Sequence, residues 1–370
     1  MRIQNNIHLM YCLNIYKGES WAENFKAIRK EAAEVKKNFC PNEPFALGVR
    51  LSGAAVVELK KALPTFKDFL KNNGFYVVSI NGFPFGSFHG TVIKEKVYQP
   101  DWSTKERVEY TKDLVDILTE LLPPDEVGSI STVPLFYGKK ENTKCEDNIM
   151  EITEYLAIKE GETGKRILLS LEPEPDCYLD DLRSTVKYFH RLFKGSENTK
   201  KYIGVCLDCC HSSVEFESSL DWYRMLKANG IKVMKVQISS ALKAKLQSRE
   251  EANEALTPFI DKEYLHQVRI HTGRDLLKFN DLPAALSGFV PGEWRIHFHV
   301  PVTWEGEKLS STTDNLEEEF FALLSADGKK HLELETYTYR IIPGKKLPIN
   351  ESIISELNWL KSKMEQPLRF

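Results

Sequence analysis

The sequence predicts a single (β/α)8 barrel, the TIM-barrel fold, with an insertion between its later strands. Apolar, strand-like runs alternate with amphipathic helical patterns along the chain. Most runs begin about 30 residues or more after the previous one, as parallel βαβ units require. Nearly every run ends in a polar residue, and the active sites of such barrels form where the strands end. A doubly wound sheet usually carries a Gly-rich phosphate turn after an early strand, and this sequence has none.

The sequence contains one more strand-like run than a barrel needs. The nine runs span residues 7–14, 45–52, 75–82, 128–135, 166–175, 202–211, 232–240, 294–302 and 331–339. Either the first run or one of the last three therefore lies outside the barrel. We expect one domain over residues 1–370, with an insertion at about 241–290 and a C-terminal helix at about 350–365.

The segments between the runs are predicted to form helices. Ser20 and Glu23 have the spacing of a capping box, and they stand at the start of an apolar stripe that includes Trp21. Residues 55–72 also carry an apolar face. Pro64 predicts a kink or a split in that helix, because proline lacks the N–H that the helix interior needs.

The composition favours a globular protein that does not bind nucleic acid. Of the 370 residues, 42% are hydrophobic and 28% are charged, and the net charge is −3. Lys and Arg are scattered, whereas a nucleic-acid groove needs a clustered basic face. No apolar run reaches the length of a membrane span, and the first residues lack the apolar stretch of a signal peptide. Seven cysteines without a regular spacing indicate reduced thiols, so we expect a cytoplasmic protein with no direct membrane insertion.

Polar residues at the ends of the runs are candidate metal ligands. Side chains alternate along a strand, so residues two apart share a face. Carboxylates, an amide and an imidazole that meet at one barrel mouth suit Mn²⁺, Mg²⁺ or Zn²⁺. Such an ion would polarise a substrate carbonyl or hydroxyl, and a spare carboxylate would act as the base. The candidate metal ligands are Glu172, Asp208, Gln237, His299 and Glu335, and the candidate catalytic residues are Glu172, Glu335 and His211.

Several of these residues also have a structural interpretation. Glu172 and Asp208 lie on otherwise apolar strands, and they could form salt bridges inside the barrel, since an unpaired buried charge is costly. Gln237 could serve only to satisfy backbone groups. Glu333, which shares a face with Glu335, could likewise be structural.

Loops that follow the strands provide candidate substrate contacts. Residues 81–90 combine glycines, which allow close backbone approach, with aromatic side chains that could wall a pocket. Residues 97–102 extend this region as part of a lid, and a packed irregular loop is the alternative. The candidate substrate-binding residues are Asn81, His89, Glu174 and His297.

The segment GVCLDCCH, residues 204–211, holds three thiols, a carboxylate and an imidazole. A redox Cys-x-x-Cys needs a thiolate at a helix N-terminus in a thioredoxin-like setting. A structural zinc site needs a second ligand pair, and the sequence has no other Cys pair of this spacing. We therefore interpret the thiols as packing residues, and Asp208 and His211 as the residues that carry chemistry.

The Asp-x-x-His of Asp208 and His211, preceded by Glu172, resembles the xylose isomerase-like TIM-barrel superfamily of sugar isomerases, epimerases and endonuclease IV-type enzymes. From about residue 8 to 340 the chain is similar to the metabolite-traffic protein EboE family. The similar segments are YCLNIYKGESW, INGFPFGSFHG, VYQPDW, GSISTVPL, LEPEP, CLDCCH, KVQISSAL, HFHVPV and LELETYTY. This resemblance implies a pathway that processes or moves a metabolite precursor, with a prenyltransferase-like membrane protein as a candidate partner.

The superfamily resemblance also implies roles for single residues. It makes Glu172 and Asp208 metal ligands, and His211 a substrate contact or an additional ligand. Sugar epimerases have a His on the next strand, where this chain has Gln237. Their final-strand Glu corresponds to His299 by spacing or to Glu335 by residue type.

Together these observations favour a divalent-metal-dependent isomerase, epimerase or lyase that acts on a polyhydroxylated or cyclic small metabolite. A non-catalytic carrier that passes a metabolite to a membrane enzyme is the alternative, because Gln237 replaces the expected His. A phosphodiesterase like endonuclease IV is a remote third, because too few histidines can be placed together and the net charge is wrong for DNA. Metal analysis of the protein and of its Glu172→Gln and Asp208→Asn variants tests the first hypothesis.

Overall fold

Eight parallel strands form the closed barrel that the sequence predicts. The computed structural model describes residues 1–140, 142–306 and 308–365. The barrel strands, in order around the barrel, are β2 (Ile7–Tyr11), β3 (Phe45–Arg50), β4 (Phe75–Asn81), β5 (Gly128–Thr132), β6 (Ile167–Leu171), β7 (Ile203–Asp208), β8 (Lys232–Ile238) and β14 (His331–Leu334). A parallel bridge between Cys12 and Gly48 closes the barrel between β2 and β3. The short strand β1 (Arg2–Ile3) pairs antiparallel with β2 and lies outside the ring.

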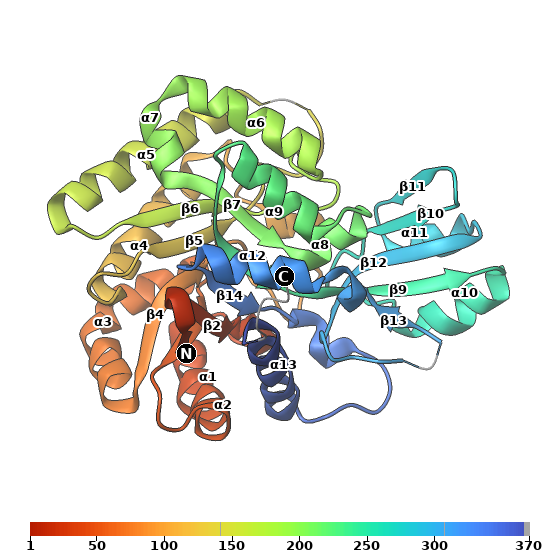
Figure 1. The fold of residues 1–370 in the computed structure, drawn as a ribbon, viewed down its shortest axis with the longest axis horizontal. Coiled ribbons are helices and arrows are strands. Elements are labelled where there is room, and N and C mark those ends of the chain that lie inside the picture. The colour runs from red at the N-terminus through yellow and green to blue at the C-terminus, as the bar shows by residue number, and fades with distance from the viewer. Residues whose placement is uncertain (141, 307, 366–370) are drawn as a thin grey trace.

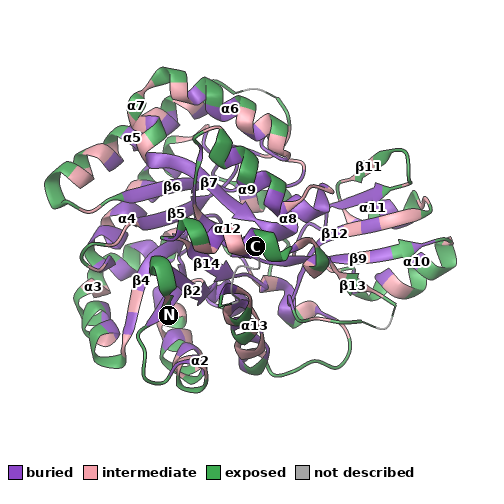
Figure 2. Ribbon diagram, in the orientation of Figure 1, coloured by how far each residue is buried: buried purple, intermediate pink, exposed green. Residues whose placement is uncertain are grey.

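Helices surround this barrel (Figure 1). They are α1 (Trp21–Ala27), α2 (Ala33–Phe39), α3 (Gly53–Asn73), α4 (Lys105–Leu121), α5 (Lys144–Thr163), α6 (Leu182–Gly195), α7 (Glu197–Tyr202), α8 (Cys209–Val214), α9 (Ser219–Ala228), α12 (Glu318–Asp327) and α13 (Ile349–Met364). Figure 2 shows buried residues concentrated in the barrel strands and exposed residues on the outer faces of the helices. None of the helices in the described part of the chain is long and apolar enough to cross a membrane.

Local sequence signals explain two of these helices in different ways. The predicted capping box is confirmed, since Glu23 N–H donates to Ser20 Oγ at 3.2 Å and Ser20 N–H donates to Glu23 Oε2 at 3.0 Å. The predicted split at Pro64 is wrong, because α3 continues through it. Pro64 and Lys60, whose carbonyl loses its helical partner, both lie on the exposed face, where water can bond to that carbonyl.

A second, antiparallel sheet stands beside the barrel, at the right of Figure 1. Its strand order is β11 (Leu276–Phe279), β10 (Val268–His271), β12 (Gly292–Val300), β9 (Ser240–Leu246) and β13 (Ser310–Ser311), and it carries the helices α10 (Arg249–Leu256) and α11 (Leu282–Ser287). The run at residues 294–302 belongs to β12, so this is the run that lies outside the barrel. The excursion between β8 and β14 therefore extends past the insertion expected at about 241–290.

The interior of the barrel is polar below the strand ends. Lys235 on β8 and Glu333 on β14 are both fully buried, and Lys235 Nζ lies 2.6 Å from Glu333 Oε2. Gly48 on β3 makes room for this pair, because a Cβ atom at that position would collide with Glu333 Oε1. Glu333 therefore has a structural role, as the sequence analysis allowed.

Candidate active site

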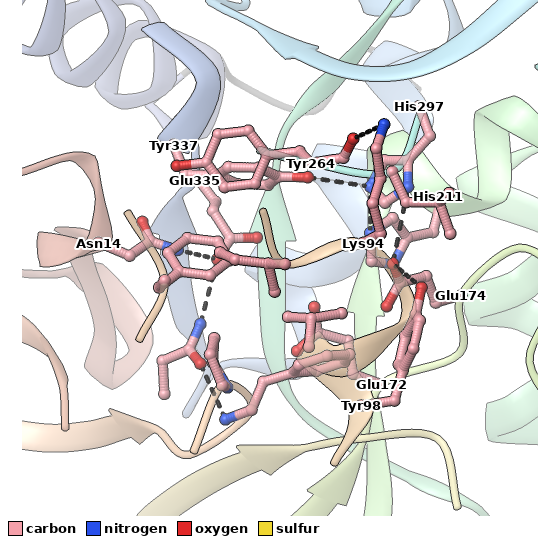
Figure 3. A pocket seen from close by; sticks show the side chains of 17 residues that line it. Asn14, Lys94, Tyr98, Glu172, Glu174, His211, Tyr264, His297, Glu335 and Tyr337 are labelled. Atoms are coloured by element: carbon pink, nitrogen blue, oxygen red, sulfur yellow. Dashed lines mark hydrogen bonds and ion pairs between the residues drawn. The ribbon is translucent and has the colours of Figure 1, made fainter. Parts of the chain in front are cut away.

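A cavity opens at the C-terminal ends of the barrel strands. Its residues come from the barrel, from the loop after β4 and from the second sheet, and Figure 3 shows their side chains and labels ten of them. The lining residues are Asn14, Asn81, Phe83, Pro84, Phe88, Ile93, Lys94, Val97, Tyr98, Glu172, Glu174, His211, Tyr264, Leu265, His297, Glu335 and Tyr337. The position matches the general rule that barrel active sites form from the segments that follow the strands.

Three buried carboxylates meet at the inner end of the cavity. Glu172 follows β6, Asp208 ends β7 and Glu335 follows β14. Each offers an oxygen within 4.8 Å of the oxygens of the other two, and the three residues are only 3%, 2% and 4% exposed. Glu172 Oε2 and Asp208 Oδ2 have no hydrogen-bond partner. Because buried charges of one sign need a counterion, this cluster fits a bound divalent cation.

Burial dominates the electrostatics of this cluster. It raises the pKa of Glu172 well above 4.5, and the nearby Glu335 and Asp208 raise it further. The pKa of Glu335 is raised in the same way by burial and then by Asp208. A bound cation would offset both causes, because it supplies the positive charge that the cluster lacks.

Two amides hold Glu335 in place. Asn14, just after β2, donates from Nδ2 to Glu335 Oε1 at 2.8 Å, and Asn81, at the end of β4, donates to the same oxygen at 3.1 Å. Asn81 was predicted to bind substrate, and it lines the cavity while it orients the carboxylate. Asn14 was not among the predicted site residues, although it ends the first strand-like run.

Three histidines lie beside the carboxylates. His211 comes from α8, whereas His297 and His299 come from β12 of the second sheet. The Nε2 atom of His297 lies 3.1 Å from that of His211 and 3.2 Å from that of His299. Burial lowers the pKa of His297 well below 6.5 and that of His299 to about 4. His299 therefore reaches the site from outside the barrel, and Glu335 is the carboxylate that follows the final barrel strand.

Glu174, another predicted substrate contact, lies on the wall of the cavity. It accepts a hydrogen bond of 2.8 Å from the hydroxyl of Tyr98. Burial raises its pKa to about 7. Tyr98 belongs to the loop segment 97–102 that was expected to form part of a lid, and its side chain is fully buried against the cavity.

Four predicted residues are not among those that line the cavity, namely Asp208, His299, His89 and Gln237. Asp208 and His299 lie beside lining residues. His89 is not among the lining residues, and its imidazole lies 3.6 Å from Glu19 Oε1 and beside the ring of Phe88. Gln237 lies in β8, pairs in register with Asp208 and Glu333, and has no hydrogen-bond partner for either amide atom. Gln237 is fully buried. Its role as a metal ligand stays a prediction.

The cysteines are free thiols that are all buried, as expected. Cys210 has a further property, because its sulfur lies within 4.8 Å of ligand atoms of His297 and His299. Burial raises the pKa of the Cys210 thiol well above its usual range, so it is held as a neutral thiol.

The cavity offers little to a negatively charged ligand. Among the described residues that line it, Lys94 is the one Lys or Arg. Its Nζ is already bonded to Asp281 Oδ2 at 2.8 Å and to the carbonyl oxygen of Tyr264 at 2.6 Å. The outer wall is apolar and aromatic, with Phe88, Tyr264 and Tyr337 in mutual ring contact.

The structure is similar to solved structures over nearly its whole length. A D-tagatose 3-epimerase-like protein matches with a TM-score of 0.53 at 12% identity, over 97% of both chains. An IOLI protein with a bound zinc atom matches with a TM-score of 0.52 at 12% identity, over 98% of this chain and 100% of that one. A protein from Mycobacterium smegmatis in complex with magnesium, itself described as a xylose isomerase-like TIM barrel, matches with a TM-score of 0.51 at 10% identity, over 97% of both chains. The fold is that of the xylose isomerase-like TIM barrels.

No family model and no curated protein matches the sequence. At 10–12% identity these solved structures establish the fold of the chain and nothing more specific. Its function therefore has to be argued from its own cavity and its own ligand atoms.

Proposed function

We propose that this protein is a divalent-metal-dependent isomerase, epimerase or lyase that acts on an uncharged, polyhydroxylated or cyclic small molecule. The observation that carries the proposal is the buried cluster of Glu172, Asp208 and Glu335, which has unpartnered oxygens and lines or borders the cavity. D-Tagatose 3-epimerase-like and L-ribulose 3-epimerase structures share the fold, which supports the reaction class by analogy.

The three carboxylates would hold the cation. A divalent ion in that position polarises a carbonyl or hydroxyl oxygen of a bound molecule. The protein contributes the geometry: Asn14 and Asn81 fix Glu335, and the backbone N–H of His211 and the hydroxyl of Ser239 fix Asp208 at 2.9 Å and 2.8 Å.

Glu172 and Glu335 are the proposed groups that move a proton. Both line the cavity, and neither forms an ion pair within the described part of the chain. A carboxylate within hydrogen-bond reach of a bound molecule can act as its general base and, after proton transfer, as its general acid. His211, which also lines the cavity, is the proposed contact to a substrate hydroxyl.

The wall of the cavity favours an uncharged substrate. A phosphate or carboxylate group would meet Glu172, Glu174 and Glu335, and the single lining cation is already paired. The aromatic outer wall suits the apolar face of a sugar or cyclitol ring. Membership of the EboE family, and delivery to a prenyltransferase-like membrane protein, belong to this proposal and are supported by the sequence segments alone.

Hydrogen–deuterium exchange into a carbon-bound position tests the proposal without knowledge of the product. Protein freed of metal and reloaded with Mn²⁺, Mg²⁺, Zn²⁺ or Co²⁺ would be incubated in D2O with neutral ketoses, aldoses and inososes, and loss of C–H signals followed by NMR. We expect exchange with at least one neutral compound and one metal. The Glu172→Gln and Glu335→Gln variants should exchange at least about a hundredfold more slowly.

Glu319→Gln provides the matched control, because Glu319 is exposed on α12 and is not among the residues that line the cavity. It should exchange at the wild-type rate. Binding of a neutral compound without exchange under any metal would contradict catalysis and favour the carrier hypothesis instead. Faster exchange with sugar phosphates than with neutral sugars would contradict the substrate class.

A further inference from the structure

Three buried imidazoles meet at a point beside the carboxylate cluster. His211 is 6% exposed, His297 2% and His299 0%. Their Nε2 atoms face one another, at 3.1 Å between His211 and His297 and at 3.2 Å between His297 and His299. Two different elements, α8 and β12, bring them together, so the convergence is not a consequence of sequence proximity alone.

The hydrogen atoms of two of these rings are fixed on the opposite nitrogen. His211 Nδ1 lies 2.9 Å from the carbonyl oxygen of Pro173, and His299 Nδ1 lies 2.9 Å from the carbonyl oxygen of Glu335. A carbonyl oxygen only accepts hydrogen bonds, so each Nδ1 atom carries a hydrogen.

Gln267 fixes the hydrogen of the third ring. His297 Nδ1 lies 2.7 Å from Gln267 Oε1. The amide has a defined orientation, because Gln267 Nε2 donates to the carbonyl oxygen of Pro175 at 3.1 Å. Gln267 Oε1 is therefore an acceptor and His297 Nδ1 a donor. Glu174 Oε1, another acceptor, lies 3.6 Å from the same nitrogen.

The Nε2 lone pair of His297 consequently faces the Nε2 lone pairs of both His211 and His299. A neutral imidazole with its hydrogen on Nδ1 has only a lone pair at Nε2, and two lone pairs cannot form a hydrogen bond. The hydroxyl of Tyr337, 3.5 Å from His297 Nε2, can satisfy at most one of the three. A cation at their centre would satisfy all three. Metal-binding histidines have this arrangement, with the other ring N–H held by a carbonyl or carboxylate oxygen.

Asp208, which belongs to the carboxylate cluster, also lies beside these histidines. It is 2% exposed, and its Oδ1 accepts from His211 N–H and Ser239 Oγ while its Oδ2 has no partner. A carboxylate oxygen of Asp208 lies within 4.8 Å of ligand atoms of His211 and His299. Asp208 is also a member of the three-carboxylate cluster, so it can belong to two ligand sets.

We propose that His211, His297 and His299 form a second cation site, separate from the carboxylate site and joined to it by Asp208. Three imidazole nitrogens and one carboxylate oxygen match the four-coordinate sites that take Zn²⁺. The all-carboxylate set instead suits Mg²⁺ or Mn²⁺. The two sites thus select different ions, and the second one does not depend on the proposed reaction.

Cobalt titration of the metal-free full-length chain tests the second site. Co²⁺ bound by three imidazoles in a four-coordinate site absorbs visible light strongly, whereas Co²⁺ in a six-coordinate oxygen site absorbs weakly. We expect two Co²⁺ per chain by elemental analysis and a strong band for one of them. Zn²⁺ should remove the strong band at one equivalent, and a large excess of Mg²⁺ should not.

Variants separate the two sites. His297→Gln and His299→Gln should each lose one Co²⁺ and the strong band while they keep the other ion. Glu335→Gln should lose the weakly absorbing ion and keep the band. His190→Gln is the matched control, because His190 is exposed and bonded to Asn229, and it should bind as the wild type does. Thermal melts of each variant establish that it folds.

Some results would overturn the proposal. They are a wild type that binds Co²⁺ without the strong band, loss of both ions in His297→Gln or His299→Gln, or retention of the strong band in both histidine variants. A wild type that binds the strongly absorbing Co²⁺ but no ion at the three carboxylates would leave this proposal standing. It would contradict the proposed metal-dependent function.

Discussion

Lys235 and Glu333 are the most deeply buried pair of opposite charges in the described barrel. Both side chains are 0% exposed, and Lys235 Nζ also donates to Ser131 Oγ at 3.1 Å. Burial acts to lower the pKa of Lys235, yet Glu333 and the other nearby acidic groups together outweigh it and raise the pKa, so the ammonium stays charged. Lys235 acts to lower the pKa values of Glu172 and Glu335, whereas Glu333 acts more strongly to raise that of Glu335. The pair as a whole therefore adds no net positive charge beneath the carboxylate cluster.

We predict that Lys235→Met lowers the free energy of unfolding by about 3–5 kcal/mol, because it leaves Glu333 buried without a counterion. Lys235→Met combined with Glu333→Gln removes both charges and should recover a large part of that loss. Urea denaturation followed by circular dichroism measures both values. A double variant that is less stable than the single one would show that Glu333 is stabilised by something other than Lys235.

The polar residues at the strand ends, and the alternation of side chains along each strand, predicted much of the site. Both can be recognised from a few neighbouring residues in the sequence. Glu172, Asp208 and Glu335 end or follow barrel strands and converge. His297 and His299 share a face, as the spacing of two predicts. Sequence could not show that Gln267 orients His297, because that contact joins β12 to the residue just before β10, in a sheet whose pairing was unknown.

At the scale of elements, a network of ion pairs ties the second sheet to the barrel. Arg269 on β10 is fully buried. Its Nη2 atom lies 2.7 Å from Asp176 Oδ1 and 2.6 Å from Glu215 Oε1. These two acids follow β6 and α8, which are elements of the barrel. Since β12 lies next to β10, the same contacts position the strand that carries His297 and His299.

Arg269→Met is expected to loosen the second sheet before the barrel. It leaves Glu215 buried without its main partner, which costs more than the loss of an exposed ion pair. Amide hydrogen exchange followed by mass spectrometry should show at least about tenfold faster exchange in β10 and β12 and little change in β2 to β7. The control is Arg274→Met, at an exposed position on the hairpin between β10 and β11. Equal acceleration in all strands would contradict a local role.

The helix α13 contains a carboxyl group that makes stability depend on pH. Glu356 is 1% exposed, and its Oε2 accepts from the N–H of Val302 and the hydroxyl of Thr336. Burial raises its pKa from 4.5 to about 7. The folded protein therefore keeps a proton that the unfolded chain releases between pH 4.5 and 7. Stability from this group is present below pH 4.5 and decreases as the pH rises to 7.

Glu356→Gln should remove this dependence, because the amide oxygen still accepts both hydrogen bonds and carries no charge. Relative to the wild type, the variant should gain roughly 3 kcal/mol of stability between pH 4.5 and 7 and gain nothing further above pH 7. Urea titrations at several pH values measure the difference. A difference that does not change with pH would mean that Glu356 is ionised in the folded protein or titrates near its ordinary pKa.

The strand β12 shows that the pattern of apolar runs could not decide which run lies in the barrel and which lies in a second sheet. Its polar C-terminal end resembles those of the barrel strands, and polarity alone does not tell a parallel partner from an antiparallel one. The segment SALKAKL alternates apolar and polar residues from Leu242 onwards, which is typical of a strand with one buried face. It forms β9 and pairs antiparallel with β12. That alternation was the available signal for a second sheet.

At the scale of the whole molecule, the candidate ligands join parts of the chain that are far apart in sequence. Glu172, Asp208 and Glu335 come from three barrel strands, and the histidines of β12 add the second sheet. The unfolded chain lacks this arrangement, so a cation binds the folded state far more tightly. Bound metal should therefore stabilise the barrel and the second sheet together.

We predict that a metal concentration about 100 times the Kd raises the free energy of unfolding by about 2.7 kcal/mol for one site. Removal of metal with EDTA should lower the Tm by a few degrees, because a protein of this size shifts by less per kcal/mol than a small domain. Differential scanning calorimetry with and without Mn²⁺ measures the shift. The Glu172→Gln, Glu335→Gln double variant should lose the Mn²⁺-dependent shift, whereas Glu319→Gln should keep it. An equal Mn²⁺ shift in the double variant would place the stabilising ion elsewhere, since that variant lacks two of the three carboxylates of the cluster.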